Sequence, residues 1–232
     1  MIPFLGPLDP FPPVTEARQE MNGLLAVGGR LLPDRLLDAY RRGIFPWGTV
    51  EGQALWYSPD PRMVLFPENF RLSRSLRRLL RSATLTISAD RDFPAVIAAC
   101  AATRRRGQDG TWISDEMMEA YIRLHELGWA HSVEAWEEGE LVGGLYGMAI
   151  GRMFYGESMF SRRDNASKFA FAYLIRLLRE RGFGMIDCQM YTDHLASLGA
   201  AEIPRSEFVQ RMHTLIGQGE RSAWQLAATT DW

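Results

Sequence analysis

Two acidic side chains stand inside apolar, strand-like segments of this chain. Glu157 lies within Phe-Tyr-Gly-Glu-Ser-Met-Phe-Ser at 154–161, and Asp187 lies within Ile-Asp-Cys-Gln at 186–189. A buried carboxylate costs free energy unless it is paired or used in chemistry. Two such placements predict a single active site that contains both segments.

Strand alternation suggests how these groups are presented. Asp187 and Gln189 would share one face of their strand, with Cys188 on the other face as a core residue. A capping or loop-anchoring pair explains the same spacing. Phe154 and Glu157 would lie on opposite faces of an ideal strand, and a β-bulge at Gly156 would bring them to one side, as bulges beside active sites do.

Several familiar chemistries are excluded. The chain has neither a phosphate-binding Gly-x-x-x-x-Gly-Lys-Ser/Thr motif nor a Gly-x-Gly-x-x-Gly motif, and Ser158 lacks the flanking glycines of a nucleophile elbow, so we expect it to be structural. None of the four histidines has metal-ligand spacing, and His125 and His131 are expected to be structural. With two cysteines, neither a disulfide scaffold nor a four-cysteine zinc site can form, so no metal is predicted.

Composition places the chain among ordinary soluble globular proteins. It has 232 residues, of which 47% are hydrophobic and 23% charged, enough for one large domain or two small ones. No segment reaches the roughly 18 uncharged apolar residues of a membrane span, and the first residues lack the basic start of a secretory signal. We therefore expect a cytoplasmic protein.

Charge is unevenly distributed along the chain. Residues 1–108 hold 15 Arg against 10 acidic residues, whereas the remainder holds 11 basic and 18 acidic residues. A row of arginines at helical spacing suits phosphate backbones; it consists of Arg71, Arg74, Arg77, Arg78 and Arg81, with Arg104, Arg105 and Arg106 following. A solvated helix face is the alternative, and since Lys168 is the only lysine, the arginines also fit a bias in composition.

The elements that must position these groups follow an α+β order. Helices are predicted at 33–40, 71–80, 93–102, 115–127 and 165–181, a hairpin at 131–146, and strands at 154–160 and 185–190, with a parallel pairing across the long helix. We predict three regions: a Pro-, Gly- and Trp-rich N-terminal domain at 1–62, a basic helical segment at 63–108 and a catalytic domain at 109–232.

Many longer motifs resemble the leucyl/phenylalanyl-tRNA-protein transferases. They include Asn-Gly-Leu-Leu-Ala-Val-Gly-Gly at 22–29, Gly-Ile-Phe-Pro-Trp at 43–47, Trp-Tyr-Ser-Pro-Asp-Pro-Arg at 56–62 and Gly-Glu-Ser-Met-Phe-Ser at 156–161. Further matches stand at 111–113, 131–134, 141–147, 166–168, 186–189 and 197–200. The resemblance runs in order from Asn22 to Phe208 and is highly specific.

The resemblance implies a small N-terminal α/β domain followed by a domain like the acyl-CoA N-acyltransferases (GNAT-like), with no CoA and no other cofactor. It implies an enzyme that moves Leu or Phe, and less readily Met, from aminoacyl-tRNA to the N-terminal Arg or Lys of an acceptor protein. That residue would mark the acceptor for degradation by the N-end rule. The expected partners are Leu-tRNA, Phe-tRNA and such acceptor proteins, without a membrane.

The resemblance also implies roles for individual residues. Asp187 and Gln189 match the proposed proton relay, in which Asp187 polarises the Gln189 amide, and Glu157 is expected to orient the terminal nucleotide or the amine. The aminoacyl side-chain pocket is expected to contain Leu145, Phe154 and Ile186, with Phe171, Leu174 and Leu178 as further candidates from a helix stripe. Trp47 and Trp112 match aromatics that contact the terminal adenosine, and the arginines from Arg71 to Arg81 would meet acceptor-stem phosphates.

Some positions depart from the family pattern. Gly48–Glu51 (Gly-Thr-Val-Glu) is less aromatic than expected, and Thr192 stands near the relay where Asn is usual. The tail at 217–232 matches nothing useful.

Two other classes of protein fit parts of the chain. An acyl-CoA N-acyltransferase would need a Gly-rich pyrophosphate-binding loop, and this chain does not have one at 162–165. A noncatalytic RNA-binding module would give Glu157 and Asp187 no purpose.

Overall fold

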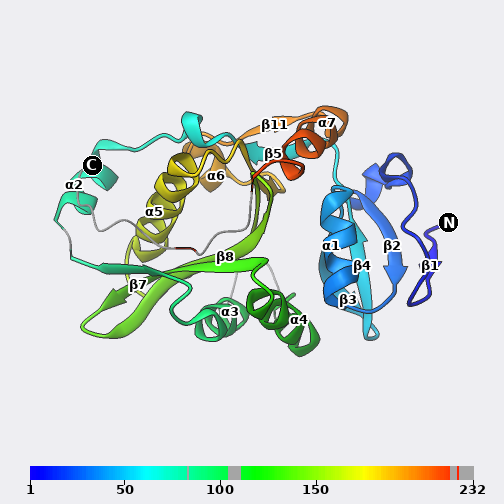
Figure 1. The fold of residues 1–232 in the computed structure, drawn as a ribbon, viewed down its shortest axis with the longest axis horizontal. Coiled ribbons are helices and arrows are strands. Elements are labelled where there is room, and N and C mark those ends of the chain that lie inside the picture. The colour runs from blue at the N-terminus through cyan, green and yellow to red at the C-terminus, as the bar shows by residue number, and fades with distance from the viewer. Residues whose placement is uncertain (83, 104–110, 220–223, 225–232) are drawn as a thin grey trace.

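Two β-sheets organise the chain in a computed structural model, which describes residues 1–82, 84–103, 111–219 and 224 (Figure 1). A four-stranded sheet belongs to the N-terminal part, and a seven-stranded sheet runs through the rest. The arginines at 104–106 and the domain boundary predicted at 108/109 lie outside the described residues. Within the described ranges, no helix has the length and apolar character to cross a membrane.

The small sheet has the strand order β1-β2-β4-β3. Its strands are β1 (Phe4–Leu5), β2 (Leu24–Gly28), β3 (Phe45–Val50) and β4 (Gln53–Tyr57), and only β1 and β2 pair in parallel. Two short 3-10 helices, Val14–Glu16 and Gln19–Met21, precede β2. The helix predicted at 33–40 is α1 (Pro33–Arg41), which begins with Pro at its first position, and Gly43 follows at φ +75°. The small α/β domain is therefore confirmed.

The large sheet has the order β11-β5-β10-β9-β8-β7-β6. Its strands are β5 (Arg62–Leu65), β6 (Thr86–Ala89), β7 (Ala130–Glu137), β8 (Glu140–Ile150), β9 (Met153–Ser161), β10 (Met185–Gln189) and β11 (Ala201–Ile203). Strands β9 and β10 run parallel, with Ile186 opposite Phe154, and the other pairs are antiparallel. The predicted hairpin and the parallel pairing are both confirmed.

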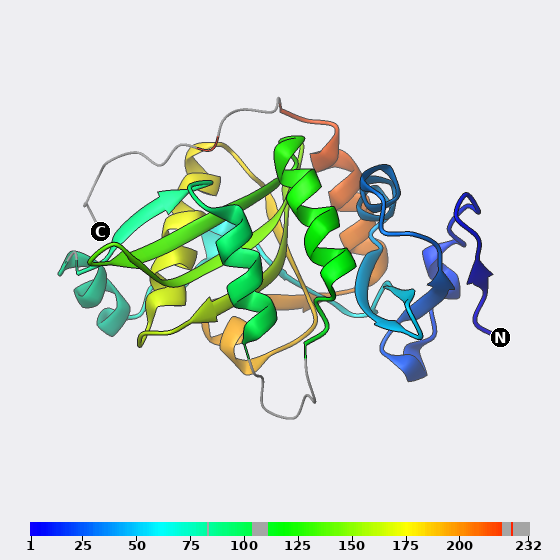
Figure 2. The same ribbon diagram turned by 90° about the horizontal axis from the view of Figure 1, so that it is seen from below.

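Helices cover both faces of the large sheet. Helix α5 (Ala166–Glu180) packs on one face, and α3 (Phe93–Ala102) and α4 (Asp115–Glu126) pack on the other (Figures 1 and 2). The remaining helices are a 3-10 turn at Pro67–Asn69, α2 (Arg74–Arg81), α6 (Asp193–Ser197) and α7 (Arg205–Ile216). Side-chain caps begin α3 and α4, where Asp92 and Ser114 accept from Ala95 and Met117 N–H groups.

The segment 63–108 is not only helical. Strand β6 pairs with β7 at one edge of the large sheet, and β5 pairs with β10 near the other edge. Through these two strands the segment belongs to the same large sheet as the strands that follow residue 109. The three predicted regions remain a prediction about how the chain divides.

Candidate active site

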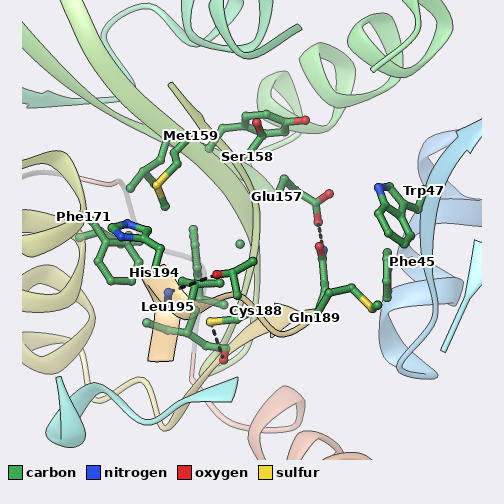
Figure 3. A pocket seen from close by; sticks show the side chains of 18 of the residues that line it. Phe45, Trp47, Glu157, Ser158, Met159, Phe171, Cys188, Gln189, His194 and Leu195 are labelled. Atoms are coloured by element: carbon green, nitrogen blue, oxygen red, sulfur yellow. Dashed lines mark hydrogen bonds between the residues drawn. The ribbon is translucent and has the colours of Figure 1, made fainter. Parts of the chain in front are cut away.

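A cavity of about 430 Å³ opens on the α5 face of the large sheet, between that sheet and the N-terminal domain (Figure 3). It lies where β9 and β10 stop pairing, just beyond the contact between Tyr155 and Asp187. Side chains from β3, β8, β9, α5, β10 and α6 line it. Both acidic segments singled out in the sequence therefore reach this one place.

Glu157 occupies a β-bulge in β9. Its neighbours Ser158 and Gly156 pair with consecutive residues of β8, so Glu157 is the extra residue of the strand. The predicted bulge is confirmed, and it places Phe154 and Glu157 on the same cavity wall.

Glu157 is 8% exposed as a residue, and its carboxylate accepts hydrogen bonds from two buried tyrosines. Tyr40 donates to Oε1 at 2.6 Å and Tyr121 donates to Oε2 at 3.1 Å, and the two hydroxyls also contact each other. Burial raises the pKa of Glu157 from its ordinary 4.5 to about 7, although the tyrosine hydrogen bonds act against that rise. The pKa values of Tyr40 and Tyr121 are themselves raised well above 10, chiefly by burial, so both remain protonated donors.

Asp187 is fully buried in an ion pair with Arg62 of β5, which is also fully buried. Arg62 donates from Nε to Oδ1 at 2.8 Å and from Nη2 to Oδ2 at 2.7 Å, a bidentate pair. The Arg62 guanidinium also lies over the rings of Phe45 and Phe208. Asp187 does not line the cavity, and the bonds to Arg62 fix its carboxylate in place.

Gln189 does line the cavity, and its contacts differ from the predicted relay. Its backbone N–H donates to Asp187 Oδ1 at 2.9 Å, whereas its side-chain amide donates to Glu157 Oε1 at 3.3 Å (Figure 3). The predicted shared face of Asp187 and Gln189 is wrong, because Gln189 has φ +64° and β10 is irregular between the two residues. Cys188 also lines the cavity, because alternation along the strand places it on the same face as Ile186, which lines the cavity too. Burial raises the pKa of the Cys188 thiol, which therefore stays protonated.

The deeper part of the cavity is apolar. Five of the six predicted pocket residues line it, namely Leu145, Phe154, Phe171, Leu174 and Ile186, whereas Leu178 is buried in the same hydrophobic cluster without being among the lining residues. Phe154 lies against Gly147 of β8, where an added Cβ would stand 2.5 Å from its ring. Met159, Met190 and Leu195 also contribute apolar surface to the cavity.

Trp47 and Trp112 line the cavity on the side of the N-terminal domain, and both are half-buried. The ring of Trp47 stands edge-on to Tyr57 at 5.4 Å. Thr192, the departure from the family pattern, lines the cavity and also begins α6, because its hydroxyl accepts from the Leu195 N–H at 3.2 Å. Asn is another favoured residue at that position of a helix, so the cap survives the difference.

The arginine row lies on and just before α2, away from the cavity lining. Its five side chains are exposed, while Leu76 and Leu80 of the same helix are buried. Ser73 begins the helix by accepting from the Leu76 N–H at 3.1 Å. The row is thus a basic surface on the predicted helix.

Sequence reasoning missed several residues of the site. Arg62 could have been found from the sequence, because burying a charged residue in an apolar strand segment costs free energy just as it does for Glu157 and Asp187. Tyr40, Tyr121 and His194 carried no such signal, since only the fold brings the two tyrosines to Glu157 and His194 to the cavity lining. Among the described residues, no three His, Cys, Asp or Glu side chains are arranged to hold a metal ion.

Comparisons with known proteins agree on one family. A family model described as leucyl/phenylalanyl-tRNA protein transferase matches residues 64–213, and the model of its N-terminal domain matches residues 29–60. The chain is 69% identical over 225 residues to the leucyl/phenylalanyl-tRNA–protein transferase of Dechloromonas aromatica, covering 97% of this chain and 96% of that one. The enzyme of the same name from Nitrosospira multiformis is 58% identical over 221 residues and is covered to 95%, as is this chain.

Among solved structures the chain is similar to FemX, with a TM-score of 0.50 and 14% identity, over 78% of this chain and 71% of that one. At that identity the likeness shows the fold alone. Together with the sheet order, it confirms the predicted α+β class with a GNAT-like domain.

Proposed function

The chain belongs to the leucyl/phenylalanyl-tRNA protein transferase family, and we propose that its cavity receives the leucyl or phenylalanyl group of an aminoacyl-tRNA and passes it to an N-terminal Arg or Lys. One observation carries the proposal: a deep apolar pocket ends at a carboxylate and an amide, Glu157 and Gln189, and two tryptophans flank it. The chain is accordingly an aminoacyltransferase. Marking of the acceptor for degradation by the N-end rule, and a cytoplasmic location, belong to the same proposal.

The apolar wall selects the donor side chain. Leucyl, phenylalanyl and methionyl groups are unbranched at Cβ and fit a pocket walled by Leu145, Phe154, Phe171 and Met159, whereas β-branched groups are rejected by shape. A single methylene changes affinity in such a pocket by about 1–3 kcal/mol, which explains why Leu and Phe are both accepted and Met less readily.

Transfer forms a C–N bond from the acceptor α-amine to the aminoacyl carbonyl carbon and breaks the ester C–O bond to the terminal ribose. The nitrogen loses a proton, and the ribose oxygen gains one. The ester is already activated and an α-amine has a pKa of about 7.7–8, so holding the two reactants together supplies much of the rate. Glu157, with a pKa of about 7, is suited to accept the proton from the amine near neutral pH.

Gln189 orients the amine in this proposal. Because its Nε2 donates to Glu157, its Oε1 is directed elsewhere and is available to accept from the incoming N–H. Asp187 acts as a positioning residue, since it holds the Gln189 backbone N–H and is itself held by Arg62. The negative charge that Glu157 gains above pH 7 also favours a cationic first residue in the acceptor.

The tRNA end is proposed to meet two surfaces. Trp47 and Trp112 stack with the terminal adenosine, a contact worth about 1–3 kcal/mol for each base. The exposed arginines at 71–81 meet acceptor-stem phosphates, and the α2 segment Arg74–Arg81 contains no acidic residue to oppose them.

The test is transfer of labelled Phe from Phe-tRNA to a peptide that begins with Arg. Wild type should transfer the label, whereas free Phe or acetyl-CoA as donor, and an N-acetylated peptide as acceptor, should give none. Gln189→Ala should lose most transfer and keep tRNA affinity, and Gln210→Ala, an exposed glutamine on α7, is the matched control. Binding of tRNA without any transfer by the wild type would instead favour the RNA-binding module, and acetyl transfer would favour the acyl-CoA enzyme.

A further inference from the structure

Trp224, which lies beyond the range of the family resemblance, is buried next to the aminoacyl pocket. It is 6% exposed and belongs to the same hydrophobic cluster as Leu145, Phe154, Leu174 and Ile186. Its ring lies 5.5 Å from that of Phe154 and 6.2 Å from that of Phe183. It does not itself line the pocket. Trp224 therefore forms a layer directly behind a pocket wall.

Trp224 also contacts a fixed histidine. Its ring stacks on His131 with centroids 4.2 Å apart and planes 9° apart. His131 Nδ1 makes a 2.8 Å hydrogen bond to Asp90 Oδ2, and the other Asp90 oxygen accepts from the Ser132 N–H at 2.9 Å. Because Asp90 anchors His131, Trp224 cannot leave its place beside Phe154 without breaking this stack.

Phe154 is confined between Gly147 and Trp224. The ring approaches Gly147 so closely that an added Cβ would stand 2.5 Å from Cζ, and the side chain is 1% exposed. Trp224 and His131 also line a second cavity of about 420 Å³, together with Trp129. Because Trp224 contacts both this cavity and Phe154, removal of the indole would give the Phe154 ring room to retreat.

We propose that Trp224 is a specificity-determining positioning residue, which sets the depth of the aminoacyl pocket by holding Phe154 forward. The inference rests on the proposed function of that pocket. It assigns to Trp224 a part in choosing the donor side chain, beyond any part in stability. Donors larger than phenylalanine are disfavoured because Trp224 prevents the retreat of Phe154.

Trp224→Ala tests this with three donors, leucyl-, phenylalanyl- and 2-naphthylalanyl-tRNA, and an Arg-initiated peptide as acceptor. We expect the ratio of kcat/KM for naphthylalanine to that for leucine to rise about tenfold, the size of effect that about one methylene produces in such a pocket. The change should arise mainly in KM, with Phe shifted less than naphthylalanine. The Trp224→Phe variant should show a much smaller rise in this ratio than Trp224→Ala, because it keeps an aromatic ring beside Phe154.

Trp129→Ala is the matched control, because Trp129 lines the same second cavity but packs against a different hydrophobic cluster from that of Phe154 and Trp224. Its donor ratio should stay within about twofold of wild type. If Trp224→Ala lowers kcat/KM for all donors by one common factor, or leaves the ratio unchanged, the inference is wrong and Trp224 is merely structural.

A variant that fails to fold does not remove the test. In that case Trp224→Phe decides, since its smaller ring should still raise the naphthylalanine-to-leucine ratio about threefold, and an unchanged ratio would overturn the inference. Wild type that transfers none of the three donors would contradict the proposed function itself, a result distinct from an unchanged ratio.

Discussion

Replacing Glu157 with Gln should stabilise the folded protein above pH 7. Burial raises the pKa of Glu157 in the folded state to about 7, from 4.5 for the ordinary group. The folded chain then holds this proton more tightly than the unfolded chain does. Its stability is therefore fully retained below about pH 4.5 and falls as the pH rises through 7.

The magnitude follows from the interval between the two pKa values. At about 1.4 kcal/mol for each pH unit, the rise from 4.5 to about 7 corresponds to about 3 kcal/mol of lost stability once the carboxyl is fully ionised. Glutamine has the same shape as the protonated carboxyl and stays neutral. Its carbonyl can still accept from Tyr40 or Tyr121, and its NH₂ group can donate to a hydroxyl oxygen.

The assay is urea unfolding followed by tryptophan fluorescence, at intervals from pH 4.5 to 8.5. The difference in free energy of unfolding, variant minus wild type, should increase by about 3 kcal/mol across that range. Glu119→Gln, an exposed position on α4, is the matched control and should give a difference that does not change with pH. A flat difference for Glu157→Gln would refute the argument that burial controls this carboxyl.

Three further changes have definite outcomes. Arg62→Leu leaves Asp187 charged and unpaired in the interior, so urea unfolding should show a loss of about 3–5 kcal/mol; a loss below about 1 kcal/mol would contradict the assignment of the buried pair. Arg77→Ala combined with Arg78→Ala should reduce the slope of log tRNA affinity against log salt by about 2, and an unchanged slope would remove α2 from the tRNA surface. Thr192→Val should lower thermal stability by about 1 kcal/mol through loss of the α6 cap, while Thr192→Asn should not; equal losses would show that capping is not its role.

The local structure was predictable because its causes are local. The start of α1 at Pro33, the bulge at Glu157 and the long helix ended by Gly182 each follow from residue types at short spacing. Five of the six predicted pocket residues line one cavity, and they were named for a different reason: motifs of the resembling family identified Leu145, Phe154 and Ile186, and a helix stripe supplied the others.

What the sequence did not reveal depends on distant contacts. Asp187 meets Arg62, which lies 125 residues away in the chain, so alternation along β10 cannot report where the carboxylate is directed. The turn at Gln189, with its positive φ, likewise has no signature in residue type, because Gln rarely adopts that conformation. Strands β5 and β6 were missed within a segment whose arginines attracted attention to its helices.

The hydrogen bonds to Glu157 come from both parts of the chain. Tyr40 belongs to α1 of the N-terminal domain, Tyr121 belongs to α4 on the large sheet, and Trp47 of β3 borders the same cavity. Neither part alone contains a complete site, so two fragments of the chain expressed separately would each be inactive until they reassociate. Transfer activity therefore requires that both parts of the molecule are folded together. A partly synthesised or proteolytically cut chain should show no transfer at all, rather than transfer with poor selectivity for the donor.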